Sequence, residues 1–143
     1  MKTLIELLHT GGYSCVIEND EVRTFTRRGV ADIHHLLKNE PDFLKGASVA
    51  DKVVGKAAAA LMVLGGVKQL YTDVISSPAL NLLTNAGVNV AFIEEVPLIR
   101  NRDNTDWCPL EKVCYEEQSP EKLLPLIDQF IAKMKANSTL LAS

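Results

Sequence analysis

The sequence predicts an α/β protein of three layers, in which helices cover both faces of a mixed sheet of about five strands. The first observation is a β-hairpin, because strand-forming residues at 13–17 and 21–27 flank the turn pair Asn19-Asp20. The second is the alternation that follows, in which strands at 67–75 and 88–96 are separated by helices. The first part of strand 88–96 has four adjacent apolar residues, 90–93, so we expect it to be buried on both faces, as central parallel strands are. The 143 residues are enough for a single domain, residues 1–143, with a proper core.

Helical spacing of apolar residues, with stop signals such as Gly65-Gly66, predicts the outer layers. The predicted helices are residues 3–9, 30–38, 51–64, 78–86, 109–115 and 120–135. Residues 39–46 form a connector, residues 47–49 add a little extended chain, and the tail 136–143 is expected to fray.

Composition limits the kinds of partner. Hydrophobic residues make up 47% and charged residues 23%, and the net charge is −3 with scattered basic residues, so we expect no nucleic-acid partner. The longest apolar run, residues 57–63, is too short to span a bilayer, and Glu6 interrupts what would be a signal peptide. The three cysteines do not form a disulfide set, so we expect a cytoplasmic protein with reduced thiols.

The predicted helix 51–64, DKVVGKAAAALMVL, is apolar on every side except at its start, which is typical of a buried helix. Its start carries Asp51, Lys52 and Lys56. Two lysines at the positive end of a helix dipole lower stability, so they favour a functional explanation, an anion held by N–H groups and ammonium groups. The alternative is that both lysine stems lie along the surface with their charges in water.

The order of elements resembles the cytidine deaminase-like fold. In that family a His- or Cys-x-Glu motif begins one helix, Pro-Cys-x-x-Cys begins the next, and these residues hold zinc and move a proton. The corresponding residues here are Val54-Gly55-Lys56 and Pro78-Ala79-Leu80-Asn81-Leu82, in which apolar residues and a lysine replace the ligands and the carboxylate. The segments DKVVGKAAA and Cys-Pro-Leu-Glu look more closely like a small bacterial family of unknown function in the same superfamily. The resemblance therefore implies the scaffold without its zinc chemistry, and we expect no metal and no cofactor.

Cys108 is a candidate nucleophile, because Pro109 follows it and makes it the cap of a short helix, where a thiol gains thiolate character. Glu111, three residues on, opposes this effect. If Cys108 lies near Lys56, then Lys56, Cys108 and Asp51 form a plausible catalytic set in which Asp51 holds the lysine. The alternative is an ordinary capping or buried cysteine.

The remaining candidate ligand-binding residues are Lys52, Ser77, Glu111, Arg100 and Trp107. Arg100 and Arg102 belong to the polar loop 97–107 and either clamp an anion or are simply solvated. Trp107 either stacks on a planar ligand such as a nucleobase or fills the core.

Two functions fit these patterns. The first is a zinc-free, enzyme-like domain that binds a small anionic or nucleotide-like molecule, and the second is a non-catalytic binding or regulatory module on the same scaffold. A homodimer that packs through residues 61–64 or the terminal helix is a third possibility, and whether the protein is an enzyme stays open.

Overall fold

The computed structural model describes residues 1–27, 30–100 and 106–142, with side chains to residue 136. Its elements in chain order are α1 (Lys2–Thr10), β1 (Cys15–Asn19), β2 (Glu21–Phe25), α2 (Ala31–Asn39), α3 (Pro41–Leu44), β3 (Ser48–Val54), α4 (Lys56–Gly65), β4 (Gln69–Ser76), α5 (Ser77–Asn85), β5 (Asn89–Val96), α6 (Pro109–Cys114) and α7 (Pro120–Ala142).

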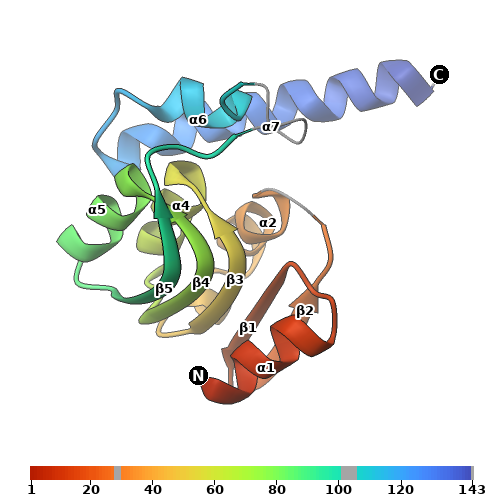
Figure 1. Ribbon diagram of the computed structural model, residues 1–143. Helices are drawn as coiled ribbons and strands as arrows, with labels where there is room; N and C mark the ends of the chain where they lie inside the picture. The colour runs from red at the N-terminus through yellow and green to blue at the C-terminus, as the bar shows by residue number, and fades with distance from the viewer. Residues whose placement is uncertain (28–29, 101–105, 143) are drawn as a thin grey trace.

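The strands form one mixed sheet in the order β2-β1-β3-β4-β5. β1 is antiparallel to both β2 and β3, whereas β3, β4 and β5 are parallel. α1 packs on one face against β1 and β3, and α2, α4 and α5 lie on the other (Figure 1). The predicted three-layer α/β/α fold with five strands is therefore confirmed, and the hairpin turns at Asp20, whose φ of 64° is left-handed.

The predicted helix 51–64 is wrong at its start, because its first four residues belong to β3. Val53 and Val54 are β-branched and pair with Val74 and Ile75 of β4, which favours extended chain. Gly55 is the N-cap residue, in an extended conformation, and the helix begins at Lys56. Lys52 and Lys56 therefore do not share a helical face.

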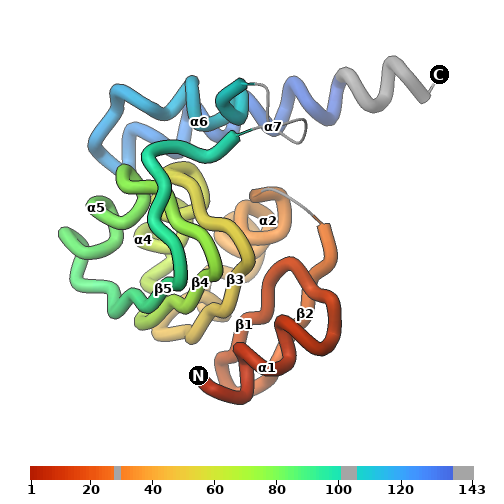
Figure 2. Tube along the Cα trace, in the orientation of Figure 1, coloured from red at the N-terminus to blue at the C-terminus, as the bar shows by residue number. Residues whose placement is uncertain are grey.

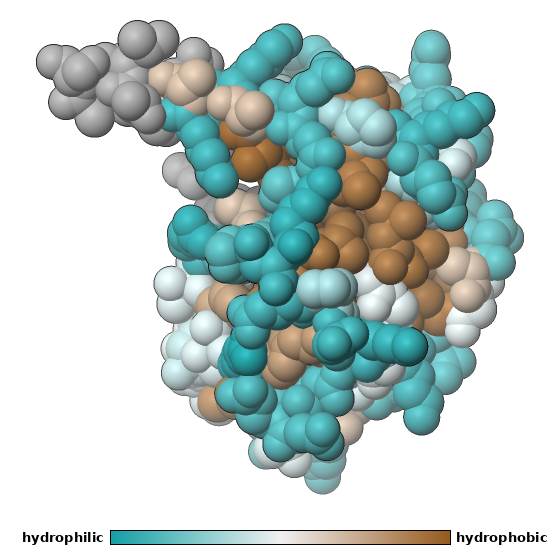
Figure 3. All heavy atoms as spheres, turned by 180° about the vertical axis from the view of Figure 1, so that it is seen from behind, coloured by the Kyte–Doolittle hydropathy of each residue, from teal (hydrophilic) through white to brown (hydrophobic). Residues whose placement is uncertain are grey.

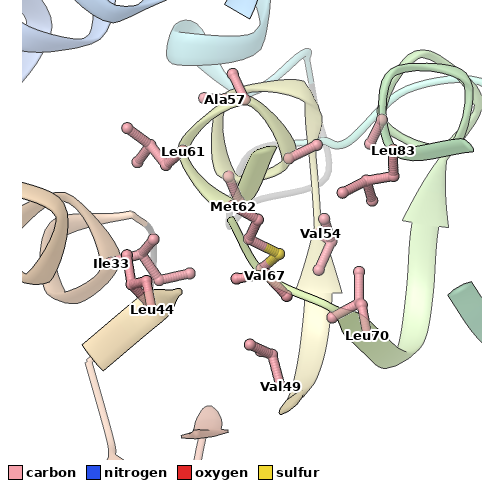
Figure 4. Packing of buried hydrophobic residues seen from close by; sticks show 14 of the residues in the cluster. Ile33, Leu44, Val49, Val54, Ala57, Leu61, Met62, Val67, Leu70 and Leu83 are labelled. Atoms are coloured by element: carbon pink, nitrogen blue, oxygen red, sulfur yellow. The ribbon is translucent and has the colours of Figure 1, made fainter. Parts of the chain in front are cut away.

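The helix that remains, α4, is buried on nearly all sides, as its composition predicted. Leu61 and Met62 have no exposed surface and pack with Val49, Val54 and Leu70 of the sheet (Figure 4). α5, α7, α2 and α6 all contact α4 as well. Within the segment 61–64, Leu61 and Met62 are enclosed, whereas Val63 and Leu64 are partly exposed.

The expectation that strand 88–96 is central and buried on both faces is also wrong. β5 is an edge strand that pairs with β4 alone, and its residues are mostly exposed. Four adjacent apolar residues, 90–93, gave the appearance of a buried strand. In the structure only Val90 among them packs partly against the core.

After β5 the chain crosses the carboxyl ends of the strands and reaches α6 and α7 (Figure 2). α7 continues to Ala142, past the helix end predicted at residue 135, and projects from the body of the molecule (Figure 1). On the helix-covered side, hydrophobic residues reach the surface in the middle of the molecule among hydrophilic ones (Figure 3). In the described part of the chain, no helix has the length and apolarity to cross a bilayer.

Candidate functional site

A cavity of about 380 Å³ lies where α4 and α5 begin, at the carboxyl ends of β3 and β4. This is the position at which open α/β sheets bind ligands. Its lining residues come from α4, α5 and the segment that follows α6, and they are Lys56, Pro78, Asn81, Tyr115, Glu116 and Gln118.

Lys56 is the first residue of α4 and is only 2% exposed, although it reaches the cavity wall. Its Nζ donates a hydrogen bond of 2.8 Å to the backbone carbonyl of Tyr115. Burial lowers the pKa of Lys56, and the nearby carboxylates of Glu111 and Glu117 oppose that shift. An ammonium group has three N–H bonds, so Lys56 can offer further donors to a ligand.

Glu111 fills the place where an anion was predicted. Its Oε1 accepts a hydrogen bond of 2.5 Å from the backbone N–H of Lys56, and its Oε2 accepts one of 3.2 Å from Ala57. These are two of the unpaired N–H groups at the start of α4. Burial raises the pKa of Glu111, and the two backbone hydrogen bonds act against that rise. The protein thus supplies its own carboxylate to this helix N-terminus.

Two cysteines of α6 lie on the same side of the molecule. Cys108 is the N-cap residue of α6 and is partly buried, and its thiol makes no capping hydrogen bond. Cys114 is fully buried, and burial raises its pKa to about 12, with Glu111 adding to the rise and Lys56 opposing it. A thiol with such a pKa is protonated at neutral pH, so Cys114 has little nucleophilic character.

A second cavity, of about 400 Å³, adjoins the first, because Tyr115 and Glu116 line both. Trp107 lines it too, and the rings of Trp107 and Tyr115 are 4.9 Å apart at an angle of 55°. Trp107 is partly exposed and is absent from the hydrophobic core. Of its two predicted roles, filling the core is therefore excluded.

The structure separates Asp51 and Lys52 from this cavity. Lys52 is an exposed residue of β3. Asp51 stands opposite Cys15 of β1, and its carboxylate accepts a hydrogen bond from Val53 N at 3.4 Å. Asp51 therefore does not hold Lys56 as predicted, because β3 carries it away from the helix start.

The other predicted residues surround the cavity without lining it. Ser77 donates from Oγ to Glu95 Oε2 at 2.7 Å, which ties the start of α5 to the end of β5. Arg100 is exposed and forms an isolated antiparallel bridge with Trp107, which closes the base of the loop between them. Arg102 lies outside the residues that the structure describes.

Sequence reasoning missed five lining residues, namely Pro78, Asn81, Tyr115, Glu116 and Gln118, and with Tyr115 the carbonyl that accepts the hydrogen bond from Lys56. Asn81 had a signal, since it lies inside the segment that resembles the second deaminase motif. The carbonyl had none, because a backbone oxygen is present at every residue. Among the described residues, no group of three or more His, Cys, Asp or Glu side chains is placed to hold a metal ion.

The fold and the cavity define a small α/β domain with a ligand-sized hollow at the carboxyl ends of its parallel strands. The chain belongs to the family described as TM1506, Domain of unknown function (DUF1893), whose model matches residues 3–131. It is similar to the crystal structure of a DUF1893 family protein (TM1506) from Thermotoga maritima, at 26% identity, a TM-score of 0.83, and coverage of 90% of this chain and 87% of that one.

A further structural match is Acinetobacter baumannii RibD, with 21% identity and a TM-score of 0.40. It covers 64% of this chain but only 33% of RibD. The search of curated proteins found no match.

Proposed function

We propose that this protein binds a small anionic or nucleotide-like molecule in the cavity beside Lys56. The observation that carries the proposal is a lysine, 2% exposed, that lines a cavity at the carboxyl ends of parallel strands. The ligand's anionic or carbonyl oxygen accepts a hydrogen bond from the Lys56 amine, and the amides of Asn81 and Gln118 hydrogen-bond its polar edge.

The energetic argument concerns the burial of a charge. Removing an ammonium group from water costs several kcal/mol unless charge and hydrogen bonds compensate it. Among the described residues, the hydrogen bond from Lys56 Nζ goes to a neutral carbonyl, and no carboxylate oxygen lies within 4.0 Å of it. A ligand that brings a hydrogen-bond acceptor to this amine would offset part of that cost. Ligand binding would therefore explain why a lysine occupies this buried position.

The contact differs from the one expected from the sequence alone. Because Glu111 already occupies the first N–H groups of α4, the ligand meets the side-chain amine of Lys56 instead of the helix N-terminus. The adjoining cavity, with Trp107 and Tyr115, suits the planar part of a nucleotide-like molecule.

The resemblance to the cytidine deaminase-like fold supports the same location. The two segments that match its motifs begin α4 and α5, and Lys56, Pro78 and Asn81 from these segments line one cavity. The ligand positions hold the apolar residues Val54, Ala79 and Leu82, all of them buried, which have no donor atoms for zinc. We therefore propose a domain of this kind that works without zinc.

Two observations favour binding over catalysis as the primary function. The Glu111 carboxylate is engaged by two backbone N–H groups, and the Cys114 thiol has a pKa of about 12. Neither group is prepared to act as a base or nucleophile at neutral pH. These two groups favour the non-catalytic binding module, the second of the two functions that the sequence suggests, and it uses the same cavity.

Thermal unfolding with a panel of nucleotides and small acids tests the proposal. For a ligand at 100 times its Kd, binding stabilises the native state by about 2.7 kcal/mol, a shift of several degrees in Tm. We expect this shift in the wild type and its loss in Lys56→Met, whose side chain has similar length but no charge.

The matched control is Lys52→Met, which changes an exposed lysine four residues earlier and should keep the wild-type shift. Without ligand, Lys56→Met should be as stable as the wild type or more so, because an apolar side chain replaces a buried charge. A ligand-induced shift of equal size in Lys56→Met and the wild type would refute the role of Lys56.

A further inference from the structure

The two edges of the sheet are built differently. β2, at one edge, has five residues and carries Glu21 and Arg23. The Arg23 guanidinium bonds to Glu21 and Glu40 and lies 4.0 Å from the ring centroid of Phe43. A short edge strand with charged side chains is a common way to prevent pairing with another chain.

β5, at the other edge, is longer and carries its two charges, Glu94 and Glu95, at one end only. It has eight residues, contains no proline, lysine or arginine, and has the apolar run Val90-Ala91-Phe92-Ile93 at its middle. Ile93 is 72% exposed and Phe92 is 40% exposed. Within the described residues 1–27, 30–100 and 106–142 its strand pairing is with β4 only, which leaves one row of its backbone N–H and C=O groups without a strand partner there.

The sheet face beside this edge is also uncovered. Ala91 pairs with Tyr71, which packs under α1, so Ala91 and, by alternation, Ile93 point to the α1 side of the sheet. α1 packs against β1 and β3 and does not extend over β5 (Figure 1). Ile93 therefore presents an apolar side chain on an open face next to an unpaired backbone.

We propose that β5 pairs with β5 of a second copy of this chain, antiparallel and about a two-fold axis at Phe92, to give one continuous sheet across a homodimer. The charges of the strand select this arrangement. In a parallel, in-register pair, Glu94 and Glu95 would each face the same glutamate, which is destabilising. In the antiparallel pair, Glu94 faces Val90 of the second copy and Glu95 faces Asn89, so like charges are kept apart.

The same arrangement brings the apolar residues together. Phe92 meets its own symmetry mate on the helix-covered side, and Ile93 meets Ala91 of the second copy on the open side. An interface that uses one patch twice is the isologous type, which closes at two copies and leaves no free β5 edge. The edge with the exposed apolar run is thus the one that the dimer covers.

Light scattering after size exclusion, over a range of concentrations, measures the mass of the full chain. We expect twice the monomer mass for the wild type and a loss of the dimer, to the monomer mass, for Ile93→Lys. Because Ile93 is largely exposed, the lysine is accepted by the folded monomer, and circular dichroism confirms its fold. The matched control is Val22→Lys, at an exposed valine of the other edge strand, which should remain dimeric.

A cross-link makes the test independent of that variant. Residues at position 92 face each other across the two-fold axis at a Cα separation that suits a disulfide. Phe92→Cys should therefore form a covalent dimer on oxidation, whereas Val22→Cys should not. A wild type that stays monomeric at every concentration overturns the proposal, and so does a dimer that persists in Ile93→Lys or fails to cross-link through position 92.

Discussion

At the scale of single residues, the site contains a buried lysine and a half-buried glutamate, Lys56 and Glu111, which have different hydrogen-bond partners. Glu111 is satisfied by two backbone N–H groups, whereas Lys56 bonds to one backbone carbonyl. The two side chains therefore have different roles in the proposed site. Glu111 fixes the start of α4, and Lys56 is left with hydrogen-bonding capacity toward the cavity.

Asp51 leads to a prediction about pH. Asp51 of β3 pairs with Cys15 of the neighbouring strand β1. Burial raises the pKa of Asp51 from 3.8 to about 7, and backbone hydrogen bonds from Val53 and Lys52 oppose this rise. An acid whose pKa is higher in the folded than in the unfolded state favours folding below the unfolded pKa. That contribution is lost as pH rises from about 4 to about 7. Between pH 5 and 8, Asp51→Asn should therefore lose less stability than the wild type, by on the order of 2 kcal/mol.

Urea unfolding at pH 5 and at pH 8 measures the difference. The matched control is Asp42→Asn, at an exposed aspartate of α3, which should leave the pH dependence as in the wild type. If Asp51→Asn and the wild type lost the same free energy of unfolding over this interval, the shifted pKa of Asp51 would be refuted.

At this scale the sequence identified the important lysine but not its surroundings. Lys56 was singled out because a charge interrupts an apolar segment, and that pattern is visible locally. Glu111 contacts it from 55 residues away, and its carboxylate was predicted only to bind a ligand and to oppose the thiolate character of Cys108. No local sequence pattern indicates that a side chain from one helix caps another helix. The capping of the α4 N-terminus by Glu111 could therefore not be predicted from the sequence.

At the scale of elements, the decisive feature is the junction between β3 and α4. Gly55 has φ −99° and ψ −178°, a conformation that any residue can adopt. Glycine is needed for space, because a Cβ at this position would overlap the Glu111 carboxylate. Gly55 and Glu111 are therefore two parts of one contact between β3, α4 and α6.

This contact predicts a coupled pair of substitutions. Glu111→Ala should lower the free energy of unfolding by about 1–3 kcal/mol, because it removes the acceptor for two buried N–H groups. Gly55→Ala should cost a similar amount, since the new methyl group displaces the same carboxylate. The double variant should be about as stable as Glu111→Ala alone, because the methyl group then has free space.

Chemical unfolding of the four proteins gives the coupling energy. If the loss in free energy of unfolding of the double variant equalled the sum of the losses of the two single variants, Gly55 would be required for some reason other than the Glu111 carboxylate. A glycine substitution elsewhere, Gly12→Ala, serves as the control, because nothing lies near its Cβ position and only its left-handed φ of 68° is strained. Its cost should be the same with and without Glu111.

Comparison of the elements with the sequence also shows which of their bounds and exposures the sequence patterns predict and which they do not. Alternation and turn residues placed the hairpin, β4 and α5 within a few residues of their observed bounds. The start of α4 was misplaced because the apolar residues Val53 and Val54 were read together with the apolar helix that follows. Whether they are extended or helical depends on their pairing with β4. The exposure of a strand depends on its neighbours in the sheet, and the sequence of the strand does not show which neighbours it has. The apolar residues of β5 therefore suggested a central strand, although β5 lies at an edge.

At the scale of the whole molecule, α4 organises the domain. It contacts the sheet and the helices α2, α5, α6 and α7, so the carboxyl ends of the strands, the cavity and the last helix all depend on it. α6 and α7 close the molecule over this helix, with Leu123, Ile127 and Ile131 of α7 in the core. Residues 132–136 of α7, in contrast, lie outside the core, because they are exposed.

The different roles of the two parts of α7 give a last prediction. A chain that ends at residue 136 should unfold within about 2 °C of the full-length protein, since surface changes away from the core shift stability by about 0.5 kcal/mol or less. Ile127→Ala, in contrast, removes a side chain with no exposed surface and should cost about 2–5 kcal/mol. Thermal unfolding followed by circular dichroism compares the two changes with the full-length wild type. If the truncated chain melted at as low a temperature as Ile127→Ala, the projecting end of α7 would be needed for stability. It would then contribute through contacts outside the core, for example by packing against another molecule.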